Sequence, residues 1–211
     1  MLEKWKQKIW LQIFVIYTRY LIGGTFVFAS LIKIKGTRFT SESGADNPIN
    51  SAWHFFETLY ESGLYWRFIG IAQLTAGFLL MTQRYAKLGA IVNFPIILNI
   101  FIITLSYYFA FTPVITGAML LANFALLVWD WNELKVLFNK KPTYSEKIRL
   151  ENDKTWELTG LALFLFTFGY RAFVNKYDIF LWFGVSVLIG LIGLIIGLKR
   201  RKKTQPTLHI K

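Results

Sequence analysis

Long apolar runs separated by shorter polar stretches form the main pattern along this chain. A helix needs about 20 mainly apolar residues to cross the roughly 30 Å hydrocarbon core of a bilayer, and these runs reach or approach that length. We therefore expect an all-α, polytopic membrane protein with six transmembrane helices. Their predicted ranges are 9–32, 66–82, 86–109, 113–131, 156–171 and 179–198.

The polar stretches divide these helices into groups. Residues 1–131 are predicted to form a four-helix membrane bundle, and a polar cytoplasmic linker follows at 132–155. Residues 156–198 then form a C-terminal transmembrane hairpin, and 199–211 a basic cytoplasmic tail. The N-terminal run is longer than the apolar part of a signal peptide and lacks a cleavage site of small residues, so we interpret it as a retained first span.

The loop after the first predicted span contains a candidate amphipathic helix at about 47–62, in the sequence DNPINSAWHFFETLYESG. Asn47 can cap this helix, and Pro48 suits its first turn. Apolar and aromatic residues then recur at helical spacing, at Ile49, Trp53, Phe56 and Tyr60. We expect the helix to lie on, or dip into, the extracytoplasmic face of the bundle.

Composition and charge support a membrane location. Hydrophobic residues make up 55% of the chain and charged residues only 17%, a balance that excludes an ordinary soluble domain of this size. The formal net charge is +12, and most of the 24 Lys and Arg residues fall in segments that alternate spans place on one side. This bias predicts a bacterial inner (plasma) membrane protein with both termini in the cytoplasm. Because the charges flank spans, we expect no nucleic-acid partner.

The chain contains no cysteine, which excludes disulfides and thiol redox chemistry. It also shows no sequence signature of haem, flavin or iron–sulfur binding. We therefore expect no cofactor held by the chain itself, and electrons for any redox role would come from a partner.

The first four predicted spans each place one polar residue near mid-membrane, when depth is counted at 1.5 Å per residue from the span ends. These residues are Arg19, Gln73, Asn99 and Asn123. A buried Arg costs several kcal/mol unless it meets partners, so Arg19 is expected to face the bundle interior. Pro95 removes one helical hydrogen bond and leaves a carbonyl near Ile91 that needs a donor. The candidate ligand-binding residues are Arg19, Gln73, Asn93, Asn99 and Asn123.

Two interpretations of this polar group remain open. Arg19 can tie the helices together, because interhelical polar contacts are common and individually modest. It can instead line a pocket for a ligand with a carbonyl or anionic oxygen, since Arg offers five hydrogen-bond donors. We see no carboxylate at mid-depth in the predicted spans, so a proton relay through the membrane is poorly supported.

A second polar cluster lies on one face of the loop helix, where His54, Glu57 and Glu61 have the spacing i, i+3 and i+7. Imidazole and carboxylates at this spacing can bind a metal or supply acid–base groups at the outer mouth. The interpretation that we favour is a solvated face that pairs with Lys33, Lys35 or Arg67, so we assign no metal site.

Two further features concern packing. Asp130, at the inner end of the fourth span, is expected to pair with Arg84 or Lys87. Gly190, Gly193 and Gly197 form a stripe on the last span that permits close helix approach. We favour packing of this stripe within the chain over a dimer contact.

Two spaced motifs suggest a family. Arg19, Gly23, Phe26, Ser30 and Lys33 form R-x3-G-x2-F-x3-S-x2-K along one helical stripe. This stripe resembles the opening helix of the DoxX-like membrane proteins, in which a second glycine stands at the position of Ser30. The second span reads Gln73-x3-Gly77-x2-Leu80-x3-Arg84, which is similar to that family's E-x3-G-x2-L-x3-R pattern.

The resemblance covers about 13–131 and implies a four-helix bundle in a family that includes subunits associated with quinone-linked oxidoreductases and other accessory membrane proteins. Because Gln73 replaces an acidic residue, the ion pair with Arg19 that the family implies becomes at most a neutral hydrogen bond. The C-terminal hairpin lies outside the resemblance.

We therefore expect an integral membrane subunit whose polar site around Arg19 binds a quinone or a lipid-like ligand. It would be accessory to a larger redox or envelope complex, with membrane lipid and other membrane or periplasmic proteins as partners. The alternative is a non-enzymatic assembly factor or structural subunit in which Arg19 only stabilises helix packing. A transporter is less favoured because embedded acidic residues and paired broken helices are not evident. We assign no catalytic residue.

Overall fold

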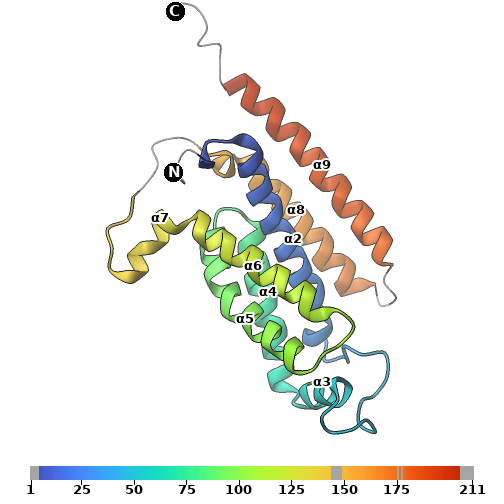
Figure 1. Ribbon diagram of the computed structural model, residues 1–211. Coiled ribbons are helices and arrows are strands. Elements are labelled where there is room, and N and C mark those ends of the chain that lie inside the picture. The colour runs from blue at the N-terminus through green and yellow to red at the C-terminus, as the bar shows by residue number, and fades with distance from the viewer. Residues whose placement is uncertain (1–4, 144–148, 175, 177, 205–211) are drawn as a thin grey trace, which may run out of the picture.

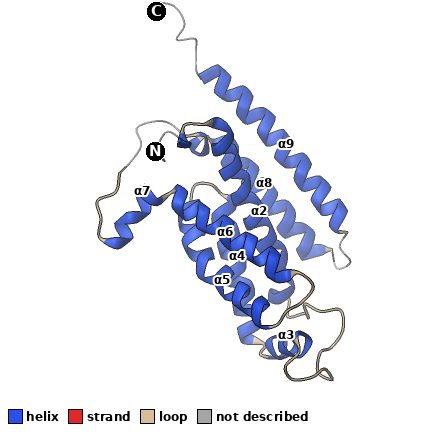
Figure 2. Ribbon diagram, in the orientation of Figure 1, coloured by secondary structure: helices blue, strands red, loops and turns tan. Residues whose placement is uncertain are grey.

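The structure is a computed structural model that describes residues 5–143, 149–174, 176 and 178–204 (Figure 1). The first four residues, part of the predicted linker, two residues of the hairpin loop and the end of the basic tail lie outside these residues. The described residues form helices, turns and loops, with no strand among them (Figure 2). The all-α prediction is therefore confirmed for this part of the chain.

The helices follow the predicted order. The first four long ones are α2 (Ile9–Ile34), α4 (Leu64–Met81), α5 (Ala86–Ser106) and α6 (Thr112–Trp129), with the short α3 (Ala52–Glu61) between α2 and α4. The linker contains α7 (Trp131–Leu134), η1 (Lys135–Phe138) and η2 (Leu150–Asn152). The hairpin consists of α8 (Lys154–Phe173) and α9 (Ile179–Thr204).

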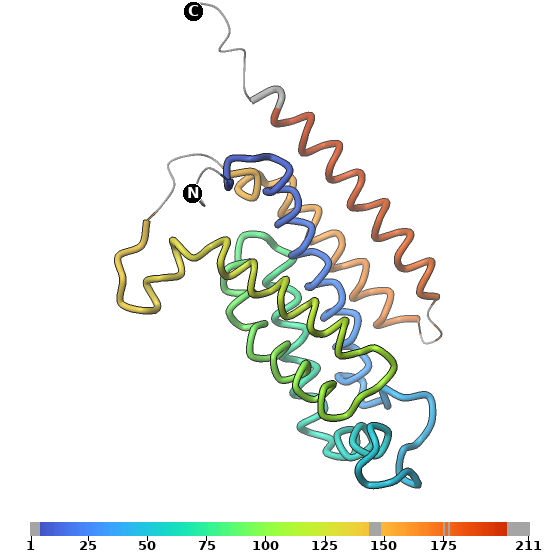
Figure 3. The backbone as a smooth tube through the Cα atoms, in the orientation of Figure 1, coloured from blue at the N-terminus to red at the C-terminus, as the bar shows by residue number. Residues whose placement is uncertain are grey.

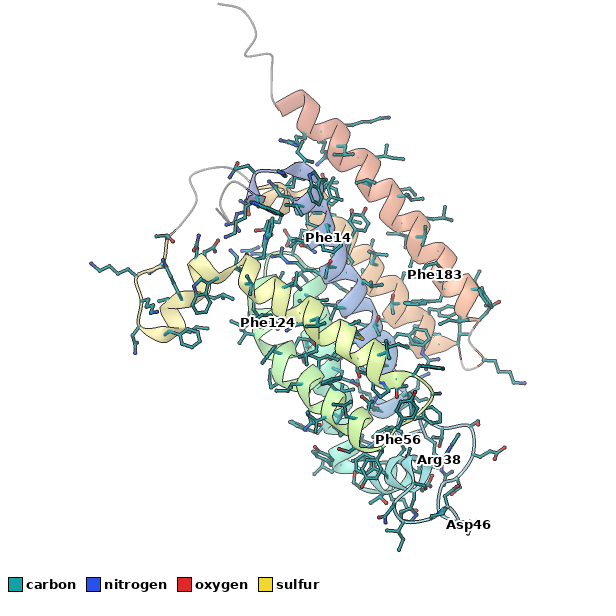
Figure 4. All side chains as sticks on the ribbon, in the orientation of Figure 1. Phe14, Arg38, Asp46, Phe56, Phe124 and Phe183 are labelled. Atoms are coloured by element: carbon teal, nitrogen blue, oxygen red, sulfur yellow. The ribbon has the colours of Figure 1, made fainter. Side chains whose placement is uncertain are left out.

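Five helices in the described ranges are long and apolar enough to cross a membrane: α2, α4, α5, α6 and α9. Their outward faces remain apolar, as a lipid environment requires. Phe14, Phe124 and Phe183 are all more than half exposed and point away from the bundle (Figure 4). The chain is thus a helical protein of the multi-pass membrane type. The fifth predicted span, α8, has 20 residues but carries Lys154, Glu157 and Arg171.

Helix α2 runs along the middle of the molecule and packs most extensively against α4, which packs on α5, which in turn packs on α6 (Figure 3). Two glycines bring α2 and α4 together. A Cβ atom at Gly23 would lie 2.8 Å from the Gly77 carbonyl oxygen, and one at Gly77 would lie 2.7 Å from the Gly23 oxygen. The glycines of the two motifs therefore face each other at a close crossing of two backbones.

The α8–α9 hairpin covers the other side of α2 (Figure 1). The Tyr20 hydroxyl donates to the carbonyl of Trp156 in α8, and the Tyr17 hydroxyl donates to Gly190 O in α9 at 2.6 Å. A Cβ atom at Gly193 or Gly197 would clash with α8 side chains, at 2.4 Å from Thr159 and 2.6 Å from Trp156. The predicted packing of the glycine stripe within the chain is confirmed.

The loop helix begins later than predicted. Ser51, and not Asn47, caps α3, because its hydroxyl accepts a hydrogen bond from the His54 N–H at 3.2 Å. Residues 48–51 form a turn in which the Ser51 N–H donates to the Pro48 carbonyl at 2.8 Å, so the helix starts only after it. The aromatic residues of α3 pack within the chain: Phe55 stacks on Tyr107 with ring centroids 4.4 Å apart.

The long helices run between two ends of the molecule. One end, which we call the linker end, holds the start of α2, the end of α9 and the linker helix η2; the other, the α3 end, holds α3 and the loop before it (Figure 1). Helix α7 and η1 extend sideways from the bundle at the linker end. This arrangement separates the predicted polar residues into two groups.

Candidate functional site

Arg19 lies at the linker end in a cluster of charged side chains. Its guanidinium contacts Asp130 at 2.8 Å, Glu151 at 2.5 Å and the Gln83 side-chain oxygen at 3.1 Å. Asp130 follows α6, Gln83 lies in the turn between α4 and α5, and Glu151 belongs to η2. The Arg19 and Asp130 side chains are each only 1% exposed. Arg19 therefore joins three separate segments to α2.

A second set of charges surrounds this contact. Arg149 approaches Asp130 at 3.4 Å, Glu133 at 3.5 Å and Glu151 at 3.3 Å, and Lys87 pairs with Glu133. We call the whole group the Arg19 cluster: Arg19, Gln83, Lys87, Asp130, Glu133, Arg149 and Glu151. Its three cations and three carboxylates balance, so the cluster neutralises its own charge.

Electrostatics keeps Glu151 ionised. Burial alone would raise the pKa of its carboxyl group, but the charge and hydrogen bond of Arg19, together with the charges of Arg149 and Lys87, outweigh burial and lower that pKa. A buried ion pair with good geometry and further hydrogen bonds loses much of its stabilising effect when one partner is removed. This arrangement matches a structural tie.

The predicted amide cluster around Arg19 is wrong. Among the described residues, the hydrogen-bond partners of the Arg19 guanidinium are Asp130, Glu151 and Gln83, and Gln73 is not one of them. The prediction assumed that all helices begin at the same depth in the membrane. In the structure, α2 begins well before the turn between α4 and α5, because Arg19 lies beside Gln83 of that turn. Arg19, eleven residues into α2, therefore meets the ends of the other helices, and not their middles.

The partners predicted for Asp130 are also wrong. Asp130 pairs with Arg19 and Arg149, and Lys87 pairs with Glu133, one turn further along the chain. The reason is again the level of Arg19, which places a guanidinium directly beside the end of α6.

Asn93 and Asn123 join α5 to α6. The Asn93 amide donates to the Asn123 oxygen at 3.0 Å, and the Asn123 amide donates to the Ala90 carbonyl at 3.0 Å; both side chains are fully buried. The carbonyl that receives this donor belongs to Ala90, the neighbour of Ile91. Asn93 and Asn123 therefore hold two helices together and do not line the cavity described next.

Gln73 and Asn99 line a cavity of about 420 Å³ at the α3 end. Side chains of α2, α4, α5 and α6 form its walls, together with Phe56 and Leu59 of α3. Its lining is mainly apolar, with Lys33, Thr104, Thr112 and Thr116 as further polar residues. Lining residues such as Tyr65 and Phe68 are more than half exposed, so the cavity reaches the surface.

The polar side chains of this cavity are incompletely paired. Gln73 is 4% exposed, and its side-chain oxygen lacks a hydrogen-bond partner in the described structure. Buried polar atoms are nearly always hydrogen-bonded, so an unpaired one that lines a cavity indicates a place for a partner. The pocket size and the mix of apolar walls with a few polar groups are typical of small-molecule sites.

The outer-mouth cluster does not come together as a metal site. Glu57 accepts hydrogen bonds from Arg38 Nε at 2.8 and 3.0 Å and from the Gly44 N–H at 3.1 Å. The hydrogen bond from Arg38 lowers the pKa of the Glu57 carboxyl. Within the described ranges, no group of three or more His, Cys, Asp or Glu residues could hold a metal ion.

The remaining residues of that cluster lie apart from this contact. Glu61 is exposed, and the imidazole of His54 has a buried Nδ1 without a partner in the described structure. The pairing predicted for this face, with Lys33, Lys35 or Arg67, is wrong for Glu57, because the loop before α3 places Arg38 against it.

Sequence reasoning missed several residues of these sites. Lys33 lies one residue beyond the predicted first span, although the motif that begins at Arg19 places it on the same stripe, and all five motif residues are buried. Gln83, Arg149 and Glu151 lie in segments predicted as loop or linker, where no periodicity signals burial. The available signal for burial of this segment is the single apolar residue Leu150 between Arg149 and Glu151. Leu150 is buried in the structure, together with Arg149.

Comparison with known proteins adds one relative. No protein-family model matches the chain, and no solved structure matches it. Over 108 residues the chain is 32% identical to the uncharacterized protein YwoB of Bacillus subtilis (strain 168), a stretch that covers 51% of this chain and 67% of YwoB. The chain belongs to the family of YwoB. Since YwoB is itself described only as uncharacterized, this membership brings no activity, and function has to be argued from the cavity and the Arg19 cluster.

Proposed function

We propose that this protein is an integral membrane subunit that binds a quinone or a lipid-like molecule in the cavity at the α3 end. The site differs from the one predicted around Arg19: Gln73 and Asn99 remain in it, and Arg19, Asn93 and Asn123 do not. The observation that carries the proposal is the unpaired, buried oxygen of Gln73 in an apolar cavity of about 420 Å³.

The shape of the cavity suits an amphiphile. Apolar side chains of α4 and α5 would receive a hydrocarbon tail, and Gln73 and Asn99 would hydrogen-bond a carbonyl or hydroxyl group. The exposed Tyr65 and Phe68 at its rim would let a ligand enter from the surface of the bundle, which lipid would surround.

The proposed setting is the bacterial inner membrane, with six spans and both termini in the cytoplasm. The charge bias supports this orientation, and the 20-residue length of α8 supports a sixth span between the five apolar ones. The DoxX-like resemblance supports a role as an accessory subunit of a redox or envelope complex, in which a partner protein supplies any electrons.

A second candidate function is a non-enzymatic assembly factor or structural subunit. The observation that favours it is the internal neutralisation of Arg19 by Asp130 and Glu151, which leaves this cation no role beyond packing. The exposed apolar residues of η1 and its neighbour Trp131 would then contact a partner protein: Trp131, Val136, Leu137 and Phe138.

Native mass spectrometry of gently solubilised protein, followed by solvent extraction, tests the first proposal. Ala72 lines the cavity, whereas its neighbour Ile71 is 55% exposed and does not. We expect the wild type and Ile71→Phe to retain a small-molecule adduct and Ala72→Phe to lose it because the larger side chain fills the cavity. An adduct retained equally by all three folded proteins, or none in any of them beside a retained protein partner, would favour the structural role.

A further inference from the structure

Lys33 brings a second unusual feature to the α3-end cavity. Its side chain lies nine-tenths buried in the cavity lining, one residue before the end of α2. The ammonium group donates to the Ala29 carbonyl at 3.0 Å. An ammonium has three N–H donors, so two of them have no acceptor in the described structure.

The surroundings of this ammonium only partly compensate its charge. It lies 5.1 Å from the ring centre of Trp66 and 5.7 Å from that of Phe39, which are cation–π distances. No ion pair joins Lys33 to a carboxylate among the residues that the structure describes. The buried carboxylate at this end, Glu57, is already held by Arg38 at 2.7 Å.

Lys33 thus differs from Arg19 in the same helix. The fold supplies carboxylates for Arg19, whereas the positive charge of Lys33 faces a cavity. A buried charge without a counter-ion is costly, so such a charge usually has a partner. Because Lys33 lines a cavity, a partner for its charge would be a molecule from outside the chain.

The level of Lys33 fits a lipid head group. Gly70 of α4 packs against the Lys33 Cβ atom and the Ser30 carbonyl, so Lys33 lies near the first turns of α4, beside Trp66. Trp and Lys residues at helix ends are typical of the membrane interface. Gln73 lies three residues beyond Gly70 in α4, which corresponds to about 4.5 Å along the helix axis. A head group at Lys33 would therefore lie at the interface, with Gln73 and the apolar walls one turn deeper.

We propose that the cavity selects an anionic amphiphile, whose phosphate or carboxylate oxygen binds the Lys33 ammonium while its chain lies against the α4 and α5 walls. This inference rests on the proposed function, because it requires a ligand in the same cavity. It narrows the ligand class, since a neutral quinone would leave the charge of Lys33 uncompensated. Gln73 hydrogen-bonds a polar group next to the head.

The test measures binding of defined probes to delipidated protein in a non-ionic detergent. The probes are dioleoylphosphatidylglycerol, the matched zwitterionic dioleoylphosphatidylcholine, free oleate and decylubiquinone. The variants are Lys33→Met, which keeps the length without the charge, and Lys33→Arg, which restores a cation. Lys35→Met is the matched control, because Lys35 loses the same charge but donates to the Arg171 carbonyl outside the cavity lining.

We expect the wild type to bind at least one anionic probe about tenfold or more tightly than phosphatidylcholine, because the choline cation offsets the charge of the phosphate that would face Lys33. Lys33→Met should abolish this preference, whereas Lys33→Arg and Lys35→Met should keep it. A preference for phosphatidylglycerol would identify a phosphate head group, and one for oleate a carboxylate.

Two results would overturn the inference in different ways. Equal binding of charged and neutral probes by the wild type and Lys33→Met, blocked in both by Ala72→Phe, would refute the anionic class and keep the proposed function. Binding of none of the four probes to the folded wild type would refute both. Because Lys33→Met removes an unpaired buried charge, its melting temperature should equal or exceed that of the wild type, so a loss of binding is not explained by unfolding.

Discussion

Arg19 and Lys33 are both more than nine-tenths buried in α2, but their charges are compensated differently. Arg19 meets Asp130 and Glu151 inside the fold, and Lys33 meets one carbonyl and two aromatic rings. This difference indicates a structural role for Arg19 and supports the binding role proposed for Lys33. It also separates the experiments that test each role.

Arg19→Leu should destabilise the protein strongly, because it leaves Asp130 and Glu151 buried beside each other without their main cation. We expect a loss of about 3–5 kcal/mol in the free energy of unfolding, the usual cost of breaking a buried ion pair. Thermal melting in detergent measures it. The triple variant Arg19→Leu, Asp130→Asn, Glu151→Gln should recover much of the loss; a single variant as stable as the wild type would exclude a structural tie.

Glu57 should make the α3 end sensitive to acid. The hydrogen bond from Arg38 lowers its pKa in the folded state. The contact therefore stabilises the fold fully above the unfolded pKa of about 4.3 and is lost as the pH falls through the folded-state pKa. We expect the wild type to melt higher than Glu57→Gln at neutral pH, with the difference closing in acid. A difference that stays constant down to pH 3 would contradict this explanation.

At the scale of elements, the α2–α4 crossing decides where both sites lie. Gly23 and Gly77 let the two backbones approach, which places the buried stripe of α2 against α4. The same crossing puts Arg19 near the α4–α5 turn and Lys33 beside Trp66. The hairpin α8–α9 then packs on the free side of α2 through Tyr17 and Tyr20.

Gly77→Ala should therefore separate α2 from α4. The added methyl group would lie 2.7 Å from the Gly23 carbonyl oxygen and 2.8 Å from a Val27 side-chain carbon. We expect a destabilisation of about 1–3 kcal/mol from overpacking, measured by thermal melting. Gly169→Ala in α8 is the control, because a Cβ atom there meets no atom within 4 Å. It should be neutral or stabilising, since Ala favours helix over Gly; equal losses in both variants would refute the close crossing.

In the molecule as a whole, the charged residues of the linker and the cavity lie at opposite ends. The charged linker segment and the Arg19 cluster occupy one end, and the cavity with α3 occupies the other (Figure 1). The proposed orientation places the first in the cytoplasm and the second outside. Six spans with both termini in the cytoplasm require that α8 cross the membrane before α9 does.

Single cysteines test this topology without background, because the chain has none. We expect Ser43→Cys, before α3, and Asp178→Cys, before α9, to react with an impermeant maleimide on intact cells or spheroplasts. Thr143→Cys in the linker should react only after the membrane is opened. If Asp178→Cys labels together with Thr143→Cys, α8 does not cross, and the six-span proposal fails.

The positions of the helices follow from the sequence, because each apolar run carries its own length and period. Their predicted ranges agree with the structure to within a few residues, apart from the longer α9, and the motif glycines were correctly placed on one stripe of each helix. The sequence also indicated Gln73 and Asn99 as polar candidates, because each interrupts an apolar run; in the structure Gln73 is buried, whereas Asn99 is exposed and lines the cavity.

The tertiary structure alone decided which of these polar residues meet. The partners of Arg19 depend on how far α2 extends past the other helices, and this offset is not encoded in the period of any one helix. Glu151 lies 132 residues further along the chain, in a linker whose sequence shows no pattern of burial. Lys33 is a candidate binding residue only because packing left a cavity beside it and paired Glu57, the buried carboxylate at this end, with Arg38. Local patterns set the elements, whereas long-range packing set the charge partners and the empty space.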